Sequence, residues 1–293
     1  MARFLGLNER LSPYGAERNY DRVEHVASSK NTVAGPFQDK QPGLSIVILN
    51  LNRPDLVASL WRAIPVLYGE FAQANTPLEI LFGDTGSTDP ETLWMLDNPP
   101  VGTRIFRNLK YNFSRCNNDL FRESRYQTVL FLNNDVLIEH NSSAVILAYN
   151  LFLTNDEECV LSAVMNFKNG LVQHAGIDFF YSSELFGFCY HPNAAHEWTH
   201  VPGATFQAPA GTGAFLMTSA ESYSLVGGFD ERYIAECQDV DLCLKFRRLN
   251  IPTVIADLGK LVHLENATRA TGEENWDDRS LYIRRWSSFV ETL

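Results

Sequence analysis

Short apolar runs that end in polar residues recur along the first half of the chain, and the run at Thr128–Leu137 is the most informative. Apolar or β-branched residues lead into Asn133, Asn134 and Asp135, and apolar character then resumes. A short run rich in Val, Leu and Phe predicts a strand that is buried on both faces. Because a buried carboxylate is costly unless it meets a cation or hydrogen-bond donors, Asp135 is a candidate metal ligand. The alternative is a strand followed by an ordinary Asn/Asp turn.

The same alternation predicts the other elements of the first half. Strands are expected at Leu44–Asn50, Leu78–Gly83 and Thr103–Phe106, and helices at Pro54–Tyr68, Pro90–Leu96 and Ser114–Glu123. Strands that alternate with helices of about ten to fifteen residues form right-handed βαβ units around a parallel sheet. The predicted fold class is therefore α/β, with a mostly parallel central sheet, helices on both faces and a nucleotide-binding half at residues 43–137. Residues 1–42 are expected to form an N-terminal arm with a short helix near Ala16–Ala27.

The second half, residues 138–293, has a less regular pattern. Its expected elements are helices at Ser142–Leu153 and Trp276–Val290, strands at Cys159–Met165 and Thr253–Ala256, a strand at the end of Pro209–Met217, and a helix opened by Glu236–Asp241 with an apolar face of Leu242, Phe246 and Leu249. Residues 166–210 are rich in turns, aromatics and histidines. The spacing of His191, His196 and His200 suggests zinc, but the Pro and Ala around them favour a loop without a catalytic zinc site.

Composition excludes several classes of protein. The 24 Lys and Arg residues against 35 Asp and Glu give a net charge of -11, which argues against a broad nucleic-acid surface. The five cysteines are scattered without a C-x-x-C pair, a pattern that suits a reducing cytoplasm. No apolar run approaches the roughly 20 residues that span a bilayer. A soluble, cytoplasmic protein is expected.

The polar residues at the predicted strand ends indicate which nucleotide chemistry is available. The first strand is not followed by G-x-G-x-x-G, and no G-x-x-x-x-G-K-S/T sequence occurs, so a dehydrogenase-type dinucleotide site and a P-loop are both disfavoured. The strand ends instead offer a set of amides, carboxylates and guanidinium groups on one edge of the sheet: Asn50, Asn52, Arg53, Asp84, Arg115, Asn117 and Asp135.

Five segments in order resemble glycosyltransferase family 2, and most closely its bacterial rhamnosyltransferase-like members, which build O-antigen and other surface polysaccharides. The segments are Ser45-Ile-Val-Ile-Leu-Asn-Leu-Asn-Arg53, Asp84-Thr-Gly-Ser-Thr-Asp89, Phe131-Leu-Asn-Asn-Asp135, Gly227-Gly-Phe-Asp-Glu231 and Gln238-Asp-Val-Asp-Leu-Cys243. The resemblance covers roughly residues 44 to 290. It implies a GT-A fold, a nucleotide-diphosphate sugar donor and inversion at the anomeric carbon.

On the donor side, the resemblance implies roles for particular residues. Asp84 matches the acid that contacts the nucleotide base, the segment from Asn50 through Asn52 to Arg53 wraps that base, and Asn117 lines the donor site. The segment Asn133-Asn134-Asp135 stands in the place of the D-x-D motif, with Asp135 as metal ligand and one carboxylate replaced by Asn133. His263 matches a late histidine that completes the metal site. The expected cofactor is a divalent metal, Mn or Mg.

On the acceptor side, the resemblance matches Asp239 to the general base, with Gln238 in place of the usual Glu. Because Asp239 and Asp241 are two residues apart, they cannot share a helix face, so Asp241 is expected to hold local backbone or a basic neighbour. The small residues of Gly211-Thr212-Gly213 suit a wall of the sugar pocket, because backbone can approach a ligand closely there. His174, in Gly170-Leu-Val-Gln-His-Ala-Gly176, lies in a segment that resembles one common in polysaccharide transferases. Residues 138–293 are accordingly expected to be the acceptor and catalytic half, with residues 166–210 as acceptor-side structure. The possible sugar or acceptor pocket comprises His174, Gly211, Thr212, Gly213, Gln238 and Asp241.

The expected function is therefore an inverting, metal-dependent glycosyltransferase. Its partners would be a nucleotide-diphosphate sugar and a glycan or lipid-linked glycan acceptor, without nucleic acid, at the cytoplasmic face of the inner membrane in peripheral association. Two alternatives stay open. A sugar nucleotidyltransferase usually carries a Gly-rich loop after the first strand, whereas Asn50–Pro54 has no glycine. A non-catalytic, sugar-binding relative in a larger assembly is the other, because Asn133 and Gln238 replace acids.

Overall fold

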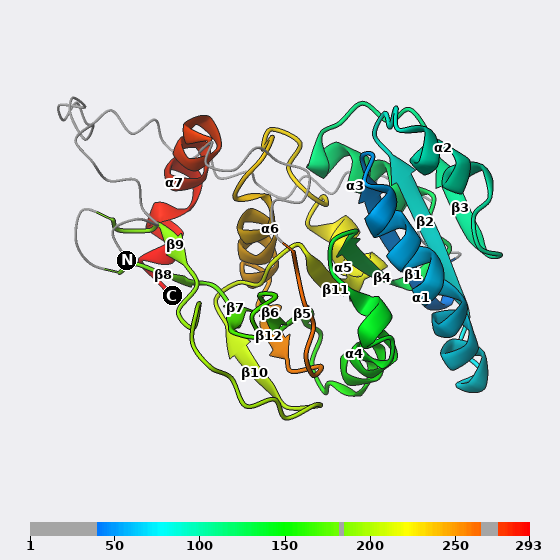
Figure 1. Cartoon of the computed structure of the whole chain (residues 1–293). Coiled ribbons are helices and arrows are strands. Elements are labelled where there is room, and N and C mark those ends of the chain that lie inside the picture. The colour runs from blue at the N-terminus through cyan, green and yellow to red at the C-terminus, as the bar shows by residue number, and fades with distance from the viewer. Residues whose placement is uncertain (1–39, 182–184, 265–274) are drawn as a thin grey trace. The chain divides into compact units, whose positions relative to one another are not determined.

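The central feature of the fold is one large sheet, seen in a computed structural model that describes residues 40–181, 185–264 and 275–293. Its strands are β1 (Gln41–Asn50), β2 (Leu78–Asp84), β3 (Thr103–Phe106), β4 (Tyr126–Asn133), β5 (Val160–Ala163), β10 (Thr205–Ala208), β11 (Phe215–Ser219) and β12 (Thr253–Ala256). The spatial order is β10-β12-β5-β11-β4-β1-β2-β3 (Figure 1). Strands β3, β2, β1 and β4 run parallel, and β11 is antiparallel to both β4 and β5. The predicted, mostly parallel α/β sheet is confirmed.

Most helices begin and end close to their predicted bounds. They are α1 (Pro54–Gln73), α2 (Pro90–Asp97), α3 (Phe113–Arg122), the single-turn η1 (Ile138–His140), α4 (Ser143–Thr154), α5 (Ala220–Leu225), α6 (Gln238–Arg247) and α7 (Trp276–Val290). Two that were not predicted, η1 and α5, are short. Pro54 opens α1, where its missing N–H costs nothing, and the Asp89 carboxylate caps α2 by accepting from the Thr92 N–H. Helix α1 continues to Gln73, beyond the predicted end at Tyr68, because Phe71 extends its buried face.

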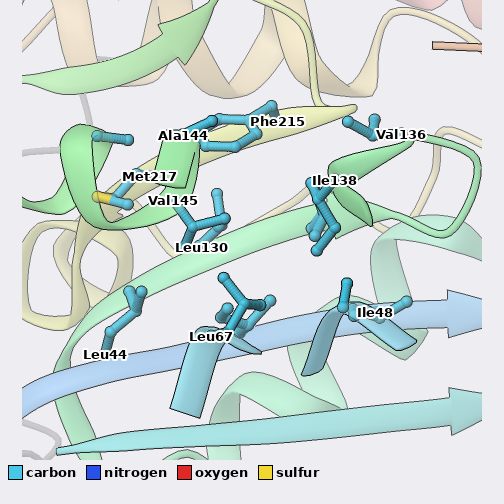
Figure 2. Close-up of a cluster of buried hydrophobic side chains, with 14 of the residues drawn as sticks. Leu44, Ile48, Leu67, Leu130, Val136, Ile138, Ala144, Val145, Phe215 and Met217 are labelled. Atoms are coloured by element: carbon cyan, nitrogen blue, oxygen red, sulfur yellow. The ribbon is translucent and has the colours of Figure 1, made fainter. Parts of the chain in front are cut away.

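Helices cover both faces of the sheet because alternate strand residues point to opposite sides. On one face Ile46 and Ile48 of β1 pack with residues of α1 and α4, and Figure 2 shows part of this cluster, in which Val145 from α4 and Leu67 from α1 lie among side chains of the sheet such as Phe215 of β11. On the other face Val47 packs in a cluster that includes residues of α3, α5, α6 and α7. Each face of the sheet thus has its own core.

The second half departs from the predictions in two places. The expected strand Cys159–Met165 is divided: β5 ends at Ala163, and β6 (Met165–Asn166) pairs instead with β7 (Val172–His174) in a separate two-stranded sheet. Leu249 was wrongly assigned to the apolar face of the helix that starts near residue 238. It follows the end of α6 and is 44% exposed, because the helix stops at Arg247.

Other predictions fall partly or wholly outside the described residues. The helix expected near Ala16–Ala27 lies there, and so does nearly all of the predicted N-terminal arm; Gln41 and Pro42 already belong to β1. The segment 166–210 contains, besides β7 and β10, the short pair β8 (Asp178–Phe179) and β9 (Cys189–Tyr190). Across the helices that the structure describes, none has the length and apolar character needed to cross a bilayer.

Candidate functional site

The carboxyl ends of β1, β2 and β4 bring the predicted strand-end residues together. Asn50 lies beside Asp84 in the register of β1 and β2, and Leu49 lies beside Asn133 in that of β1 and β4. The Asn134 amide donates to Asn50 Oδ1 at 2.8 Å, and Asn50 Nδ2 donates to the Asn52 carbonyl at 3.0 Å. Three strand ends are therefore tied into one edge, as the parallel sheet predicted.

A second set of contacts joins the loops after β1 and β2. Asn52 Oδ1 accepts from the N–H groups of Thr88 and Asp89 at 2.8 and 2.9 Å. The Asp84 carboxylate, in a residue that is 2% exposed, accepts from the Ser87 hydroxyl and from the N–H groups of Gly86 and Ser87. We call Asn50, Asn52, Asp84, Ser87 and Asn134 the rim. Its polar groups are occupied largely by one another, so the rim is preformed.

Asp135 and His263 lie in direct contact, as the resemblance implied for the metal pair. Asp135 Oδ1 is 3.1 Å from His263 Nε2, and the Leu264 N–H donates to the Asp135 carbonyl at 3.0 Å. Arg53 is close as well: its hydrogen bond to Asp55 raises the pKa of the guanidinium, and the charge of Asp135 adds to that effect. Both Asn52 and Arg53 have positive φ, an unfavourable backbone that is typical of functional loops.

The donor atoms of this pair fit a divalent metal. Two neighbouring ligands of an octahedral ion, each at about 2.1 Å, are separated by about 3 Å, which matches the observed contact. Oxygen and imidazole donors suit Mn and also admit Mg. Within residues 40–181, 185–264 and 275–293, no group of three or more His, Cys, Asp and Glu side chains could hold a metal. A metal held by this pair would therefore need further ligands from a substrate or water.

The histidines of the turn-rich segment have separate partners. His174 Nδ1 lies 3.1 Å from His191 Nδ1, and His174 Nε2 accepts from the Gly176 N–H. Burial, together with His191 and His263, holds the pKa of His174 well below its usual value, which favours the neutral ring. His200 instead contacts the Asp257 carboxylate at 2.9 Å. His174 thus lies near the Asp135–His263 pair, whereas His200 contacts Asp257 instead.

Asp239 lies at the start of α6, against the glycine-rich segment. Its Oδ2 accepts from the Gly213 N–H at 3.0 Å, and its Oδ1 from the Val240 N–H at 2.8 Å. A Cβ at Gly213 would lie 3.2 Å from the Asp239 Cβ, so only glycine allows this approach without displacement. The next residue, Ala214, accepts at its carbonyl from the Asn133 N–H at 2.9 Å. One short path of backbone therefore links Asp239 to the Asn133–Asp135 segment.

The residues close to Asp239 in sequence differ in their surroundings. Gln238 is buried, and its Oε1 has no hydrogen-bond partner among the described residues. Cys237, just before α6, has φ of 63°, another strained backbone position. Asp241 is fully buried and does not join the predicted pocket, because its carboxylate contacts Trp286 Nε1 at 2.7 Å, Arg285 at 3.1 Å and Lys245 at 3.3 Å.

The remaining predicted residues occupy supporting positions. Gly211 packs on β5, where a Cβ would come within 2.5 Å of the Ser162 Cβ, and the Thr212 carbonyl accepts from the Ser162 hydroxyl. Asn117 is buried in α3 and donates to the Phe113 carbonyl of its own helix. Arg115 forms an ion pair with Glu231. The first turn of α3 lies beside the glycine-rich segment, as the Phe113 ring shows: a Cβ at Gly213 would be 3.6 Å from it.

Two residues of this region were missed by the sequence analysis. Ser87 completes the rim, and its position inside the Asp84–Asp89 motif is the sequence feature that could have identified it. Gln173 contacts His263 through both ends of its amide. Gln173 could have been identified by its position directly before His174 in the Gly170–Gly176 segment.

The sheet order, with a parallel half whose strand ends carry the polar residues and an antiparallel β11 beside β4, defines the GT-A fold of glycosyltransferases. The structure of GalNAc-T7 solved with UDP, GalNAc and Mn²⁺ matches 85% of this chain and 50% of its own, with a TM-score of 0.59 and 12% identity. At that identity the likeness concerns the fold. The predicted GT-A fold is confirmed.

Two curated proteins are similar in sequence. The O-antigen biosynthesis protein RfbC of Myxococcus xanthus is 27% identical over 271 residues, which cover 84% of this chain and 20% of that protein. The uncharacterized protein y4gI of Sinorhizobium fredii is 26% identical over 316 residues, covering 97% of this chain and 32% of that protein. The chain thus spans a third or less of the length of these relatives. No family model matches it.

Proposed function

We propose that the chain is an inverting glycosyltransferase, which moves a sugar from a nucleotide-diphosphate donor to a hydroxyl of a glycan or lipid-linked glycan acceptor. The observation that carries the proposal is the Asp135–His263 pair at the edge of the sheet, linked through Ala214 and Gly213 to Asp239. The GT-A fold and the relative named for O-antigen biosynthesis support a role in surface-polysaccharide synthesis. A cytoplasmic location, at the membrane face where such acceptors are built, is part of the proposal.

Asp239 is assigned as the general base. The N–H groups of Gly213 and Val240 bond to its two oxygens and fix the plane of the carboxylate while leaving further lone pairs. In that position it accepts the proton of the acceptor hydroxyl as the oxygen attacks the anomeric carbon. Because attack comes from the side opposite the leaving diphosphate, the configuration inverts and no covalent enzyme intermediate is required.

The leaving diphosphate gains negative charge as its bond to the sugar breaks. Asp135 and His263 would hold a divalent metal, Mn or Mg, that stabilises this charge as a Lewis acid. The Mn²⁺ in the GalNAc-T7 structure supports that choice of ion. Arg53, within electrostatic reach of Asp135, adds positive charge from the β1 loop. Asn133 stands where the usual motif has an acid, so its amide contributes no charge.

The rim and the buried pocket residues have binding roles in this proposal. Asp84 contacts the nucleotide base, Asn50, Asn52 and Arg53 wrap it, and Asn117 lines the donor site from α3. Gly211, Thr212 and Gly213 form a wall of the sugar pocket, with His174 near the metal pair. The Oε1 atom of Gln238, buried and without a described partner, can accept a hydrogen bond from a sugar hydroxyl.

The test is incubation of the full chain with a panel of nucleotide sugars, Mn²⁺ and surface-polysaccharide acceptors, with detection of released nucleoside diphosphate. Release above the Asp239→Asn variant supports the proposal, and the panel, ranked first by thermal shift, identifies the donor. Pyrophosphate formed from a nucleoside triphosphate and a sugar phosphate would instead indicate a nucleotidyltransferase. Donor binding without any release across the panel would indicate a non-catalytic sugar-binding protein.

A further inference from the structure

Gln173 contacts the proposed metal ligand His263 twice, although the two residues are far apart in sequence. Gln173 Oε1 lies 2.7 Å from His263 Nδ1, and Gln173 Nε2 donates to the His263 carbonyl at 3.3 Å. The residue is 8% exposed and lies in the middle of β7. Gln173 itself is not among the residues that the proposed function uses.

These two contacts determine which ring nitrogen of His263 carries a proton. A backbone carbonyl only accepts hydrogen bonds, so the amide nitrogen of Gln173 must face the His263 carbonyl. The amide oxygen of Gln173 then faces Nδ1, and an oxygen acceptor requires a proton on that nitrogen. In the neutral ring, the lone pair is therefore on Nε2.

That lone pair faces a carboxylate. His263 Nε2 and Asp135 Oδ1 are 3.1 Å apart, and in the neutral tautomer fixed by Gln173 both atoms are acceptors. Two acceptors at this distance repel each other unless a cation bonds to both. The amide contact thus presents Nε2 as a metal-binding nitrogen and opposes the tautomer in which a proton would block it.

The backbone around Gln173 makes this placement rigid. Strand β7 pairs with β6, the Asn166 carbonyl accepts from the His263 N–H at 3.1 Å, and the Asn166 N–H donates to the Leu261 carbonyl at 2.7 Å. The segment that carries His263 is also paired on its other side, where His263 forms a β-bridge with Val136, the neighbour of Asp135. The hairpin of β6 and β7 therefore holds Gln173 in register with both members of the metal pair.

We propose that Gln173 is a positioning residue that fixes the tautomer and orientation of His263 for a divalent cation. The inference rests on the metal-binding part of the proposed function. It adds the β6–β7 hairpin to the metal site, so the turn-rich segment contributes to donor binding as well as to the acceptor side.

The experiment measures Mn²⁺ affinity on the full chain, from the electron paramagnetic resonance of free Mn²⁺, with and without UDP. Gln173→Leu removes the acceptor at similar volume, and we expect a 10- to 100-fold loss of Mn²⁺ affinity. Gln173→Glu keeps an acceptor for the Nδ1 proton but loses the donor to the His263 carbonyl, so it should lose clearly less affinity than Gln173→Leu. The matched control is Gln127→Leu, since the exposed Gln127 also donates to a backbone carbonyl and lies outside the site. That control should bind as wild type does.

Each outcome decides the proposal. Wild-type affinity in Gln173→Leu overturns the inference and leaves the metal site intact. Equal losses in the Leu and Glu variants indicate packing and also overturn it. A wild-type protein that binds UDP but no Mn²⁺ overturns the metal site itself. If Gln173→Leu does not fold, the ¹H–¹⁵N two-bond spectrum of neutral His263 in wild type replaces it: a proton on Nδ1 is expected, and a proton only on Nε2 refutes the proposal.

Discussion

The rim and the pair of acids at Asp135 and Asp239 are built in opposite ways. Rim side chains bond to adjacent strand ends and loops, as Asn134 does to Asn50 and as Asn52 does to Thr88 at the end of the loop that follows β2. Asp135 and Asp239 are held mainly by distant segments: His263 for the first and Gly213 for the second. The rim is thus satisfied largely by its own strand ends and loops, whereas each acid contacts a segment far from it in sequence, and under the proposed function those contacts would be where substrate, proton or metal binds.

This difference separates structural from chemical roles. Removing a rim group leaves its neighbours without hydrogen bonds, so loop geometry and nucleotide binding should change together. Removing Asp135 or Asp239 takes away a charge at the edge of the sheet and leaves the rim network intact. Single substitutions can test that separation, with the largest expected effect on turnover at Asp135 and the smallest at Asp241.

The largest effect is expected at Asp135. Asp135→Ala removes the carboxylate of a pair that already has Asn133 in place of a second acid, so metal-stimulated turnover should be abolished while the fold remains. EDTA should have the same effect on wild type. The measurement is nucleoside diphosphate release across a Mn²⁺ titration, with the exposed Asp156→Ala as a control that keeps full turnover. Full activity of Asp135→Ala, or of wild type in EDTA, would refute the role.

The next effect is expected at Asp239. Asp239→Asn keeps an oxygen for the Gly213 N–H but no longer takes a proton, so transfer should fall about 10²–10⁴-fold. Donor affinity and melting temperature should stay near wild type, because the shape and most of the hydrogen bonding survive. Single-turnover transfer with calorimetric donor binding measures both quantities. A variant that transfers sugar at the wild-type rate would exclude Asp239 as base.

The contrast between the two regions also explains what the sequence could predict. The parallel strands β1, β2 and β4 each end in a polar motif, so the strand ends and their meeting at one edge follow from local pattern and the geometry of parallel sheets. The same local signals gave β3, β12 and α7 at their observed bounds.

The contacts that orient the acids could not be predicted in this way. Gln173 and His263 are 90 positions apart in sequence. The β6–β7 hairpin that carries Gln173 begins where the expected strand Cys159–Met165 leaves the main sheet at Val164. No periodicity specifies such a break, because each residue from Val160 to Met165 is buried on either path. Leu249 was misassigned for a similar reason, since the apolar spacing continues past the residue at which α6 ends.

A smaller effect, and a direct test of the rim, is expected at Asp84. Asp84→Ala removes an acceptor for three groups of its own turn, and it should weaken free nucleoside diphosphate as well as the intact donor. Ser87→Ala is the matched variant, since it loses the hydroxyl contact to Asp84 but keeps the carboxylate. If Asp84 contacts the base, calorimetry should give a larger loss of nucleotide affinity for Asp84→Ala than for Ser87→Ala. Equal losses would assign Asp84 to the turn alone, and unchanged binding would remove it from the site.

The smallest effect on transfer is expected at Asp241, two residues from the proposed base. Its carboxylate is buried against Trp286, Arg285 and Lys245, so Asp241→Asn should lower the free energy of unfolding by about 2 kcal/mol and change transfer little.

This loss of stability in Asp241→Asn should depend on pH. Burial lowers the pKa of Lys245 and Asp241 opposes that shift, so the variant should lower the pKa further. A buried ammonium whose pKa is lowered binds fewer protons in the folded state than in the unfolded state. The free energy of unfolding therefore rises with pH, up to about pH 10.5. The stability deficit of Asp241→Asn should therefore shrink as pH rises toward that value, as denaturant unfolding at several pH values would measure. A collapse of transfer in Asp241→Asn, with Asp239→Asn active, would instead move the base two residues along the helix.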